Sequence, residues 1–225
     1  MSQTTLIIAD DHPLFRAALK EAVGRHIPGA EIVEASSLDT LQRAVVEHPD
    51  ADVILLDLRM PGASGFSALL YLRSEYPSVP VIVVSASEDA GVVRRALDFG
   101  ASGFIPKSAR IETIGESLHA VLSGRVFAPR LPARIAGAEE HDREMARRLS
   151  TLTPQQLKVL VLLAEGQSNK YIAGNLAITE ATVKAHITGL LRKLGLERRT
   201  QAAVLAQRLL QTGERADLSA LDDDG

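Results

Sequence analysis

The residues best suited to chemistry in this chain are acids that stand at the ends of apolar runs. Asp57 follows Val-Ile-Leu-Leu, and Asp10 and Asp11 follow Leu-Ile-Ile-Ala. Three carboxylates brought together repel one another, so such a cluster persists only with a cation among them. Carboxylate oxygens suit Mg²⁺, which takes a few carboxylates, water and a phosphate oxygen. The acids therefore predict a magnesium site.

A hydroxyl and an ammonium group end two further apolar runs. Ser85 ends the run PVIVVS and Lys107 ends the run SGFIPK. Acids, a metal ion, a hydroxyl and an ammonium group together suit a phosphoryl group, and a carboxylate can accept that group as an acyl phosphate. We therefore predict that Asp57 is the residue modified.

Strands and helices alternate through the first 124 residues and must bring these groups together. The strand-like runs cover residues 5–10, 30–35, 52–57, 80–85 and 102–107, and the helical patterns cover 14–23, 38–47, 65–75, 89–99 and 109–122. This alternation predicts an α/β fold, a doubly wound five-stranded parallel sheet with helices on both faces. Ligands of such sheets bind at the carboxyl ends of the strands, where the polar residues stand.

The composition limits the class of protein. Of 225 residues, 46% are hydrophobic and 24% are charged, which is typical of a soluble globular chain. Cysteine is absent, which excludes disulfides and thiolate metal sites. The start lacks the basic region of a signal peptide, and no apolar run reaches the roughly 20 residues of a membrane span. We expect a cytoplasmic protein without a membrane partner.

Charge divides the chain into parts with different expected partners. The net charge is −6 over residues 1–124, +2 over 125–150, +5 over 151–212 and −4 over 213–225. A compact basic module behind an acidic one points towards nucleic acid for the second module.

The basic module reads as helices alone. Thr153 caps a first helix that begins at Pro154, and further helices are expected at 168–176, 178–195 and 200–211. The brief turn Ala177-Ile178 joins a short helix to a longer one, as in a helix-turn-helix. The whole chain is thus predicted to combine the α/β sheet with a four-helix DNA-binding domain.

The first part resembles the receiver domain of two-component response regulators. The pieces ADDHP, LLDLRMPG, VSAS and GASGFIPK carry the resemblance. It implies that a sensor histidine kinase phosphorylates Asp57, that Ser85 and Phe104 form a switch pair, and that Lys107 neutralises the phosphoryl group. The implied Mg²⁺ ligands are Asp10, Asp11, Asp57 and the backbone carbonyl of Arg59.

The second part resembles the LuxR-type DNA-binding domain, and the pair resembles a NarL/FixJ-type response regulator. The pieces LTPQQ, LLAEGQSNKYIA, TEATVKAHI and LLRKLG carry this resemblance. It implies base-edge contacts from Lys184, Ala185 and Thr188, and phosphate contacts from Lys170, Thr182, Lys193 and Arg199. It also implies a homodimer on a two-fold DNA site, joined through residues 200–211, and a receiver that covers the recognition helix before phosphorylation.

Some residues depart from the family pattern and keep other readings open. Ala181 and Ala185 offer little direct base readout, and Gly174 costs its helix roughly 1 kcal/mol against Ala. One alternative is a phosphorylation-independent regulator that uses the receiver as a dimerisation or partner-docking module. Another is a phosphate sink whose helix-turn-helix has lapsed. A haloacid-dehalogenase-like phosphatase would need an acid where Arg59 stands, so no enzyme is expected.

The expected division of the chain is therefore a receiver over 1–124, a partly helical linker over 125–150, a DNA-binding domain over 151–212 and an acidic, disordered tail over 213–225. Within the linker, residues 138–149 are expected to form a solvated helix with ion pairs at i,i+4 spacing. Asp10 or Asp11 could also act as a helix cap, and His12 reads as a helix-start residue rather than a ligand.

Overall fold

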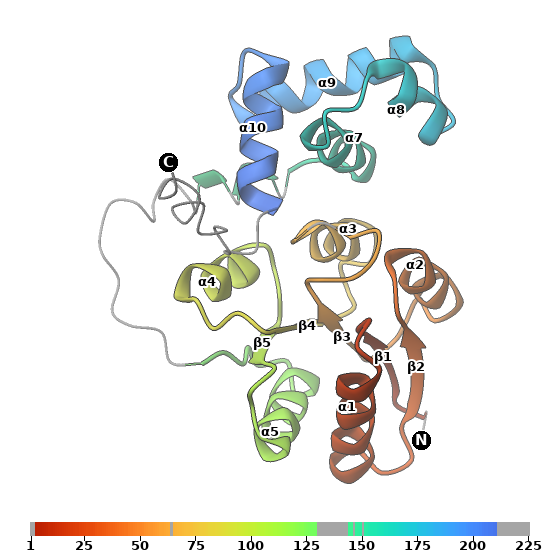
Figure 1. The fold of residues 1–225 in the computed structure, drawn as a ribbon, viewed down its shortest axis with the longest axis vertical. Helices are drawn as coiled ribbons and strands as arrows, with labels where there is room; N and C mark the ends of the chain where they lie inside the picture. Colours follow the sequence, from red (N-terminus) through yellow and green to blue (C-terminus); the bar gives the residue numbers. More distant parts are fainter. Residues whose placement is uncertain (1–2, 64, 130–143, 146, 150, 211–225) are drawn as a thin grey trace, which may run out of the picture.

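A five-stranded parallel sheet in the order β2-β1-β3-β4-β5 forms the centre of the amino-terminal part (Figure 1). The computed structural model describes residues 3–63, 65–129, 144–145, 147–149 and 151–210. The strands are β1 (Thr5–Ala9), β2 (Glu31–Ala35), β3 (Val53–Asp57), β4 (Val81–Ser85) and β5 (Gly103–Pro106). The predicted doubly wound sheet is confirmed.

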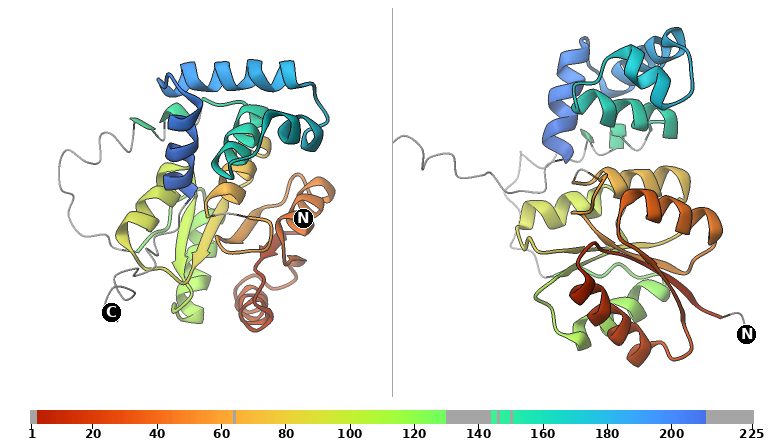
Figure 2. Two further views of the ribbon diagram at one scale, coloured as in Figure 1. Left: turned by 45° about the horizontal axis from the view of Figure 1, so that its top comes forward. Right: turned by 45° about the vertical axis from the view of Figure 1, so that its right-hand side comes forward.

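Helices cover both faces of this sheet, which Figure 2 shows from the side. On one face lie α1 (Pro13–His26) and α5 (Ile111–Leu122), and on the other lie α2 (Leu38–Glu47), α3 (Ser67–Glu75) and α4 (Ala90–Asp98). Successive side chains of a strand point to opposite faces. In β1, Leu6 and Ile8 accordingly join the α1–α5 core, whereas Ile7 joins the core beneath the other three helices. Burial on both faces explains why β1, β3 and β4 are almost continuously apolar, whereas the edge strand β2 is partly exposed and carries Glu31 and Glu34.

The carboxyl-terminal part consists of helices. They are α7 (Pro154–Ala164), α8 (Asn169–Asn175), α9 (Glu180–Leu194) and α10 (Arg199–Leu210). Helix α7 packs against α9 and α10, and α8 packs against α9. The apolar face of α9 is buried in this small core through Val183, Ile187, Leu190 and Leu194. The predicted helix-turn-helix is formed by α8 and α9.

Local signals in the sequence fix where these helices begin and end. The Thr153 hydroxyl accepts a hydrogen bond from the backbone N–H of Gln156, and the Thr153 N–H donates one to Gln156 Oε1, so α7 begins with a capping box. Ser168 caps α8 and Thr179 caps α9 with a single bond each, in which the hydroxyl accepts from the backbone N–H three residues later. Gly195 closes α9 at φ 69°, a left-handed conformation in which glycine meets no steric penalty.

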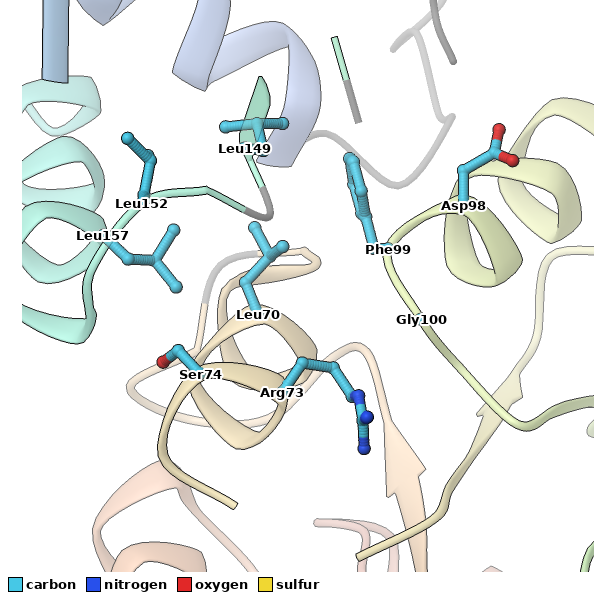
Figure 3. Close-up of a pocket in the computed structure, with 9 residues that line it drawn as sticks. All are labelled: Leu70, Arg73, Ser74, Asp98, Phe99, Gly100, Leu149, Leu152 and Leu157. Atoms are coloured by element: carbon cyan, nitrogen blue, oxygen red, sulfur yellow. The ribbon is translucent and has the colours of Figure 1, made fainter. Parts of the chain in front are cut away.

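The two parts of the chain meet between α3 and α7. Lys158 on α7 lies 3.2 Å from a carboxylate oxygen of Glu75 on α3, and its ammonium group stands 5.6 Å from the centre of the Tyr71 ring. Beside this contact a cavity of about 250 Å³ separates α3 and the end of α4 from the helical part. Figure 3 shows the side chains around it, among them Leu70, Phe99, Leu149, Leu152 and Leu157.

Two predicted segments fall largely outside the described residues. Of the linker helix expected at 138–149, only residues 144–145 and 147–149 are described, and these are helical. There Glu144 pairs with Arg148 at 2.9 Å, the i,i+4 pair that the sequence predicts. The acidic tail at 213–225 lies outside the described residues. Among the described helices, none combines the length and the apolar character that crossing a membrane requires.

Candidate phosphoryl-accepting site and nucleic-acid interface

Three carboxylates and one lysine meet at the carboxyl edge of the sheet. Asp10 and Asp11 follow β1, Asp57 ends β3, and Lys107 follows β5. The Nζ atom of Lys107 lies 2.7 Å from an oxygen of Asp10 and 2.7 Å from an oxygen of Asp57. Because β1 pairs with β3 in register, Ala9 stands beside Leu56, so the acids that follow are neighbours. The structure thus brings together four groups that the sequence predicted to share one site.

Burial sets the electrostatics of this cluster. Asp10 is fully buried and Asp57 is 2% exposed. Burial raises the pKa of Asp57 above its usual value, and hydrogen bonds from Lys107 and the Arg59 amide only partly offset this effect. Burial also lowers the pKa of Lys107, but Asp10 and Asp57 outweigh it, so the net pKa of Lys107 is raised. Lys107 therefore remains an ammonium ion.

Backbone groups hold the acids in place. The N–H of His12 donates to Asp10 Oδ1 at 2.8 Å, and the N–H of Arg59 donates to Asp57 Oδ1 at 3.0 Å. The guanidinium of Arg16 donates to the Asp10 carbonyl at 2.7 Å. Asp10 therefore bonds the loop residue that stands at the cap position of α1 rather than capping the helix itself, and it also faces Lys107.

Ser85 and Phe104 lie behind this cluster on β4 and β5. Ser85 is 3% exposed, and its Oγ accepts a hydrogen bond from the Ser87 N–H at 3.2 Å. Its carbonyl accepts one from the Lys107 N–H at 2.7 Å, which ties the end of β4 to the lysine. Phe104 is fully buried in the core. Both residues of the predicted switch pair are thus buried.

Reasoning from the sequence missed Phe15 at this site, and it interpreted His12 as a helix-start residue rather than a ligand. The ring of Phe15 lies 4.8 Å from Lys107 Nζ, a cation–π distance, and the imidazole of His12 lies beside all three acids. The contact of Phe15 with Lys107 joins residues far apart in the sequence, so no local signal indicated it. His12 does stand directly before α1, as expected, and its adjacency to Asp11 places its ring beside the acids.

The predicted base-contacting residues lie on an exposed face of α9. Lys184, Ala185 and Thr188 are exposed, as are Thr182 on the same helix and Lys170 on α8. In Figures 1 and 2, α9 lies on the side of the helical part away from the sheet. The expectation that the sheet domain covers this face is therefore not met in this arrangement, because the contact is made through α7.

Two of the predicted phosphate-contacting residues already have partners inside the helical part. Lys193 Nζ donates to the Thr151 carbonyl at 2.6 Å and to Gln156 Oε1 at 2.8 Å. Arg199 donates to Asn169 Oδ1 at 2.5 Å and to the Gln167 carbonyl. Both residues hold the domain together, and contact with phosphate stays a prediction for them.

Comparison with known proteins places these two sites in one family. The chain matches the family model of the response regulator receiver domain over residues 6–119. It matches the model of bacterial regulatory proteins of the luxR family over residues 150–206. The chain belongs to the response regulators with a LuxR-type DNA-binding domain. It is a transcription regulator rather than an enzyme.

Relatives of this response regulator align along most of their length. The glycerol metabolism activator of Pseudomonas putida is 42% identical over 207 residues, covering 89% of this chain and 94% of the relative. The nitrate/nitrite response regulator protein NarL of Escherichia coli K12 is 35% identical over 202 residues, covering 89% and 93%.

Solved structures share the fold of this response regulator. RcsB from Salmonella enterica serovar Typhimurium, bound to the promoter P1flhDC with the phosphomimetic BeF3-, matches with a TM-score of 0.53. The identity is 24%, and the match covers 93% of this chain and all of the other. At this identity the likeness concerns the fold alone.

Proposed function

We propose that a sensor histidine kinase phosphorylates Asp57 and that this modification switches the protein to a dimer that binds a two-fold site on double-stranded DNA. The observation that carries the proposal is the bridge that Lys107 makes between Asp10 and Asp57 at the carboxyl edge of the sheet. It places an ammonium group where a phosphoryl group on Asp57 would develop its charge.

The acids fit a magnesium ion. Asp10 Oδ2 and Asp11 Oδ1 are buried; the nearest cationic or donor groups are Lys107 Nζ and His12 Nδ1, each at 2.7 Å. Buried oxygens of this kind are suitable ligands for a hard cation. Asp10, Asp11, Asp57 and the carbonyl of Arg59 would hold the ion. When bound, Mg²⁺ supplies positive charge that offsets the repulsion between carboxylates and phosphoryl oxygens.

The transfer forms one bond and breaks one. A carboxylate oxygen of Asp57 attacks phosphorus, the P–N bond to the kinase histidine breaks, and its electron pair returns to the imidazole. Lys107 then pairs with the phosphoryl oxygens. Ser85 moves toward the phosphoryl group and Phe104 fills the space behind it, which biases the surface around α4 and β5 toward the active arrangement.

The output of the switch is the exposed face of α9. Lys184, Ala185 and Thr188 would contact base edges in the major groove, and Lys170 and Thr182 would contact phosphates. Lys193 and Arg199 complete the predicted phosphate set. Helix α10 would join two copies, since Val204 on this helix is 50% exposed. The proposal also includes domain boundaries at residues 124, 150 and 212. It includes a cytoplasmic location, where a kinase can reach Asp57.

The proposed switch is tested by exposing the full chain to Mg²⁺ and a small acyl phosphate donor. Intact mass and oligomeric state are measured together, with donor-free protein as the control. One labile phosphoryl group per chain and a shift from monomer to dimer are the expected results. Phosphoryl uptake without dimerisation would reject the dimer, and no uptake would reject phosphorylation from this donor class.

A second reading follows from the uncovered face of α9. Since Lys184 and Thr188 are exposed in this arrangement, the protein could bind DNA without phosphorylation, with the receiver as a dimerisation or docking module. Equal DNA affinity of phosphorylated and unphosphorylated protein would favour this reading.

Magnesium alone is expected to stabilise the protein against heat. A ligand at ten times its Kd adds about 1.4 kcal/mol to the free energy of unfolding, which raises the Tm of a chain of this size by about 3–5 °C. Asp11→Asn is expected to lose most of this rise, because it removes one anionic ligand. Asp50→Asn, a change of an exposed acid away from the site, is expected to keep it. Differential scanning fluorimetry measures all three proteins, and equal shifts would place the ion elsewhere.

A further inference from the structure

The imidazole of His12 faces the acid cluster. Its Nδ1 lies 2.7 Å from Asp11 Oδ1, 3.5 Å from Asp10 Oδ1 and 3.9 Å from Asp57 Oδ2. One ligand atom from each of these four residues lies within 4.8 Å of every other. The site therefore contains a nitrogen donor among its carboxylate oxygens.

The loop geometry keeps the ring at this place. The backbone N–H of His12 donates to Asp10 Oδ1 at 2.8 Å, and Pro13 begins α1 directly afterwards. His12 stands at the cap position of α1, yet its side chain makes no capping hydrogen bond. Its Nδ1 is turned toward the acids rather than toward the free N–H groups of the helix.

The side of the site formed by His12 is open to solvent. The side chain of His12 is 65% exposed and that of Asp11 is 33% exposed, whereas those of Asp10 and Asp57 are almost fully buried. A hydrated cation can approach past His12 and Asp11. On the inner side Lys107 already contacts Asp10 and Asp57, so an ion seated among the outer oxygens lies nearest to His12.

We infer that His12 supplies an imidazole ligand to the metal site, so that the site binds first-row transition-metal divalent cations such as Co²⁺ and Ni²⁺ through a nitrogen atom. Imidazole is a good ligand for these ions, whereas Mg²⁺ prefers oxygen atoms and water. The inference rests on the proposed metal site at Asp10, Asp11 and Asp57. It adds a selectivity that the acids alone do not have.

The test compares Co²⁺ and Mg²⁺ binding to the full chain. Isothermal titration calorimetry measures both affinities, and the visible absorption spectrum of bound Co²⁺ reports a nitrogen ligand. His12→Gln is expected to weaken Co²⁺ binding by roughly tenfold or more and to change the Co²⁺ spectrum, while Mg²⁺ affinity changes by less than about twofold. His119→Gln is the matched control, because it removes another imidazole that lies next to the ring of His26.

Each outcome decides one question. Unchanged Co²⁺ affinity and spectrum in His12→Gln would reject His12 as a ligand. Equal losses for Co²⁺ and Mg²⁺ would show that His12 only shapes the acidic loop, and would also overturn the inference. Failure of the proposed function is separate, since it would appear in the wild-type protein as absent Mg²⁺ binding or as absent phosphoryl uptake with Mg²⁺.

Discussion

Asp57→Asn is expected to abolish phosphoryl uptake while leaving the fold intact. The amide of Asn is not a nucleophile toward phosphorus, and no acyl phosphate can form at this position. The Asn side-chain oxygen can still accept the hydrogen bond that the Arg59 N–H donates to Asp57. With the acyl phosphate donor, intact mass should show one added phosphoryl group on the wild type and none on the variant.

The same substitution should leave the protein at least as stable as the wild type. Burial raises the folded-state pKa of Asp57 above the usual 3.8. Its contribution to the free energy of unfolding therefore falls as pH rises from about 3.8 toward the folded-state pKa, and the charged form opposes folding at neutral pH. Lys107 keeps Asp10 as a partner in the variant. Thermal unfolding at pH 7 measures this, and a large loss of stability would contradict it.

A matched control shows whether the loss of phosphoryl uptake is specific to Asp57 or follows from removing any negative charge. Asp50→Asn removes one carboxylate from an exposed loop before β3 and should take up a phosphoryl group as the wild type does. Uptake by Asp57→Asn at the wild-type level would show that Asp57 is not the phosphoryl acceptor. If phosphorylated Lys107→Ala formed the same fraction of dimer as the phosphorylated wild type, Lys107 would not be needed for the proposed switch.

Lys184→Ala is expected to weaken DNA binding without altering phosphoryl uptake. Lys184 lies exposed on α9, one turn before Thr188, whose hydroxyl donates to the Lys184 carbonyl at 3.0 Å. Lys184 therefore lies on the solvent-facing side of the recognition helix. Loss of one specific base contact costs about 1–3 kcal/mol, a fall in affinity of roughly 5- to 150-fold. Fluorescence anisotropy with a promoter fragment of the target measures this.

The dependence on salt tells which kind of contact is lost. If Lys184 neutralises a phosphate instead of reading a base, the slope of log affinity against log salt should fall in magnitude by about 0.9 and specificity should be kept. Lys20→Ala is the control, since this lysine on α1 pairs with Glu34 on the sheet domain. Affinity equal to that of the wild type across salt concentrations would show that the groove assignment is wrong.

The fold could be predicted because its causes are local and repeated. Five strand-like runs with helical patterns between them leave few topologies once crossovers are right-handed. The boundaries were less accurate. Helix α3 begins at Ser67 rather than near 65, with fully buried Phe66 before it, and α1 extends to His26 rather than ending at 23. Such ends depend on packing against other elements, which the local pattern does not contain.

The acid–lysine site was predictable for the same reason, since parallel strands end at one edge of the sheet. The partners of Lys193 and Arg199 were not predictable. Lys193 meets the Thr151 carbonyl across 42 residues of sequence, and Arg199 meets Asn169 across 30. A basic residue on a basic module looks the same in sequence whether it faces DNA or ties two helices together. The orientation of the His12 ring likewise depends on where Asp57 arrives, 45 residues later.

The docking of α3 against α7 leaves the recognition helix uncovered, and this has a consequence for what phosphorylation must change. The DNA affinity of a single recognition helix that is already accessible would change little if the receiver moved away. Two such helices joined in one dimer gain much, because the second then binds at the effective concentration set by the first, which multiplies affinity by about 10²–10⁴. If the proposed dimer switch operates from this arrangement, the unphosphorylated protein would present one accessible recognition helix rather than a covered one, and phosphorylation would act by raising avidity.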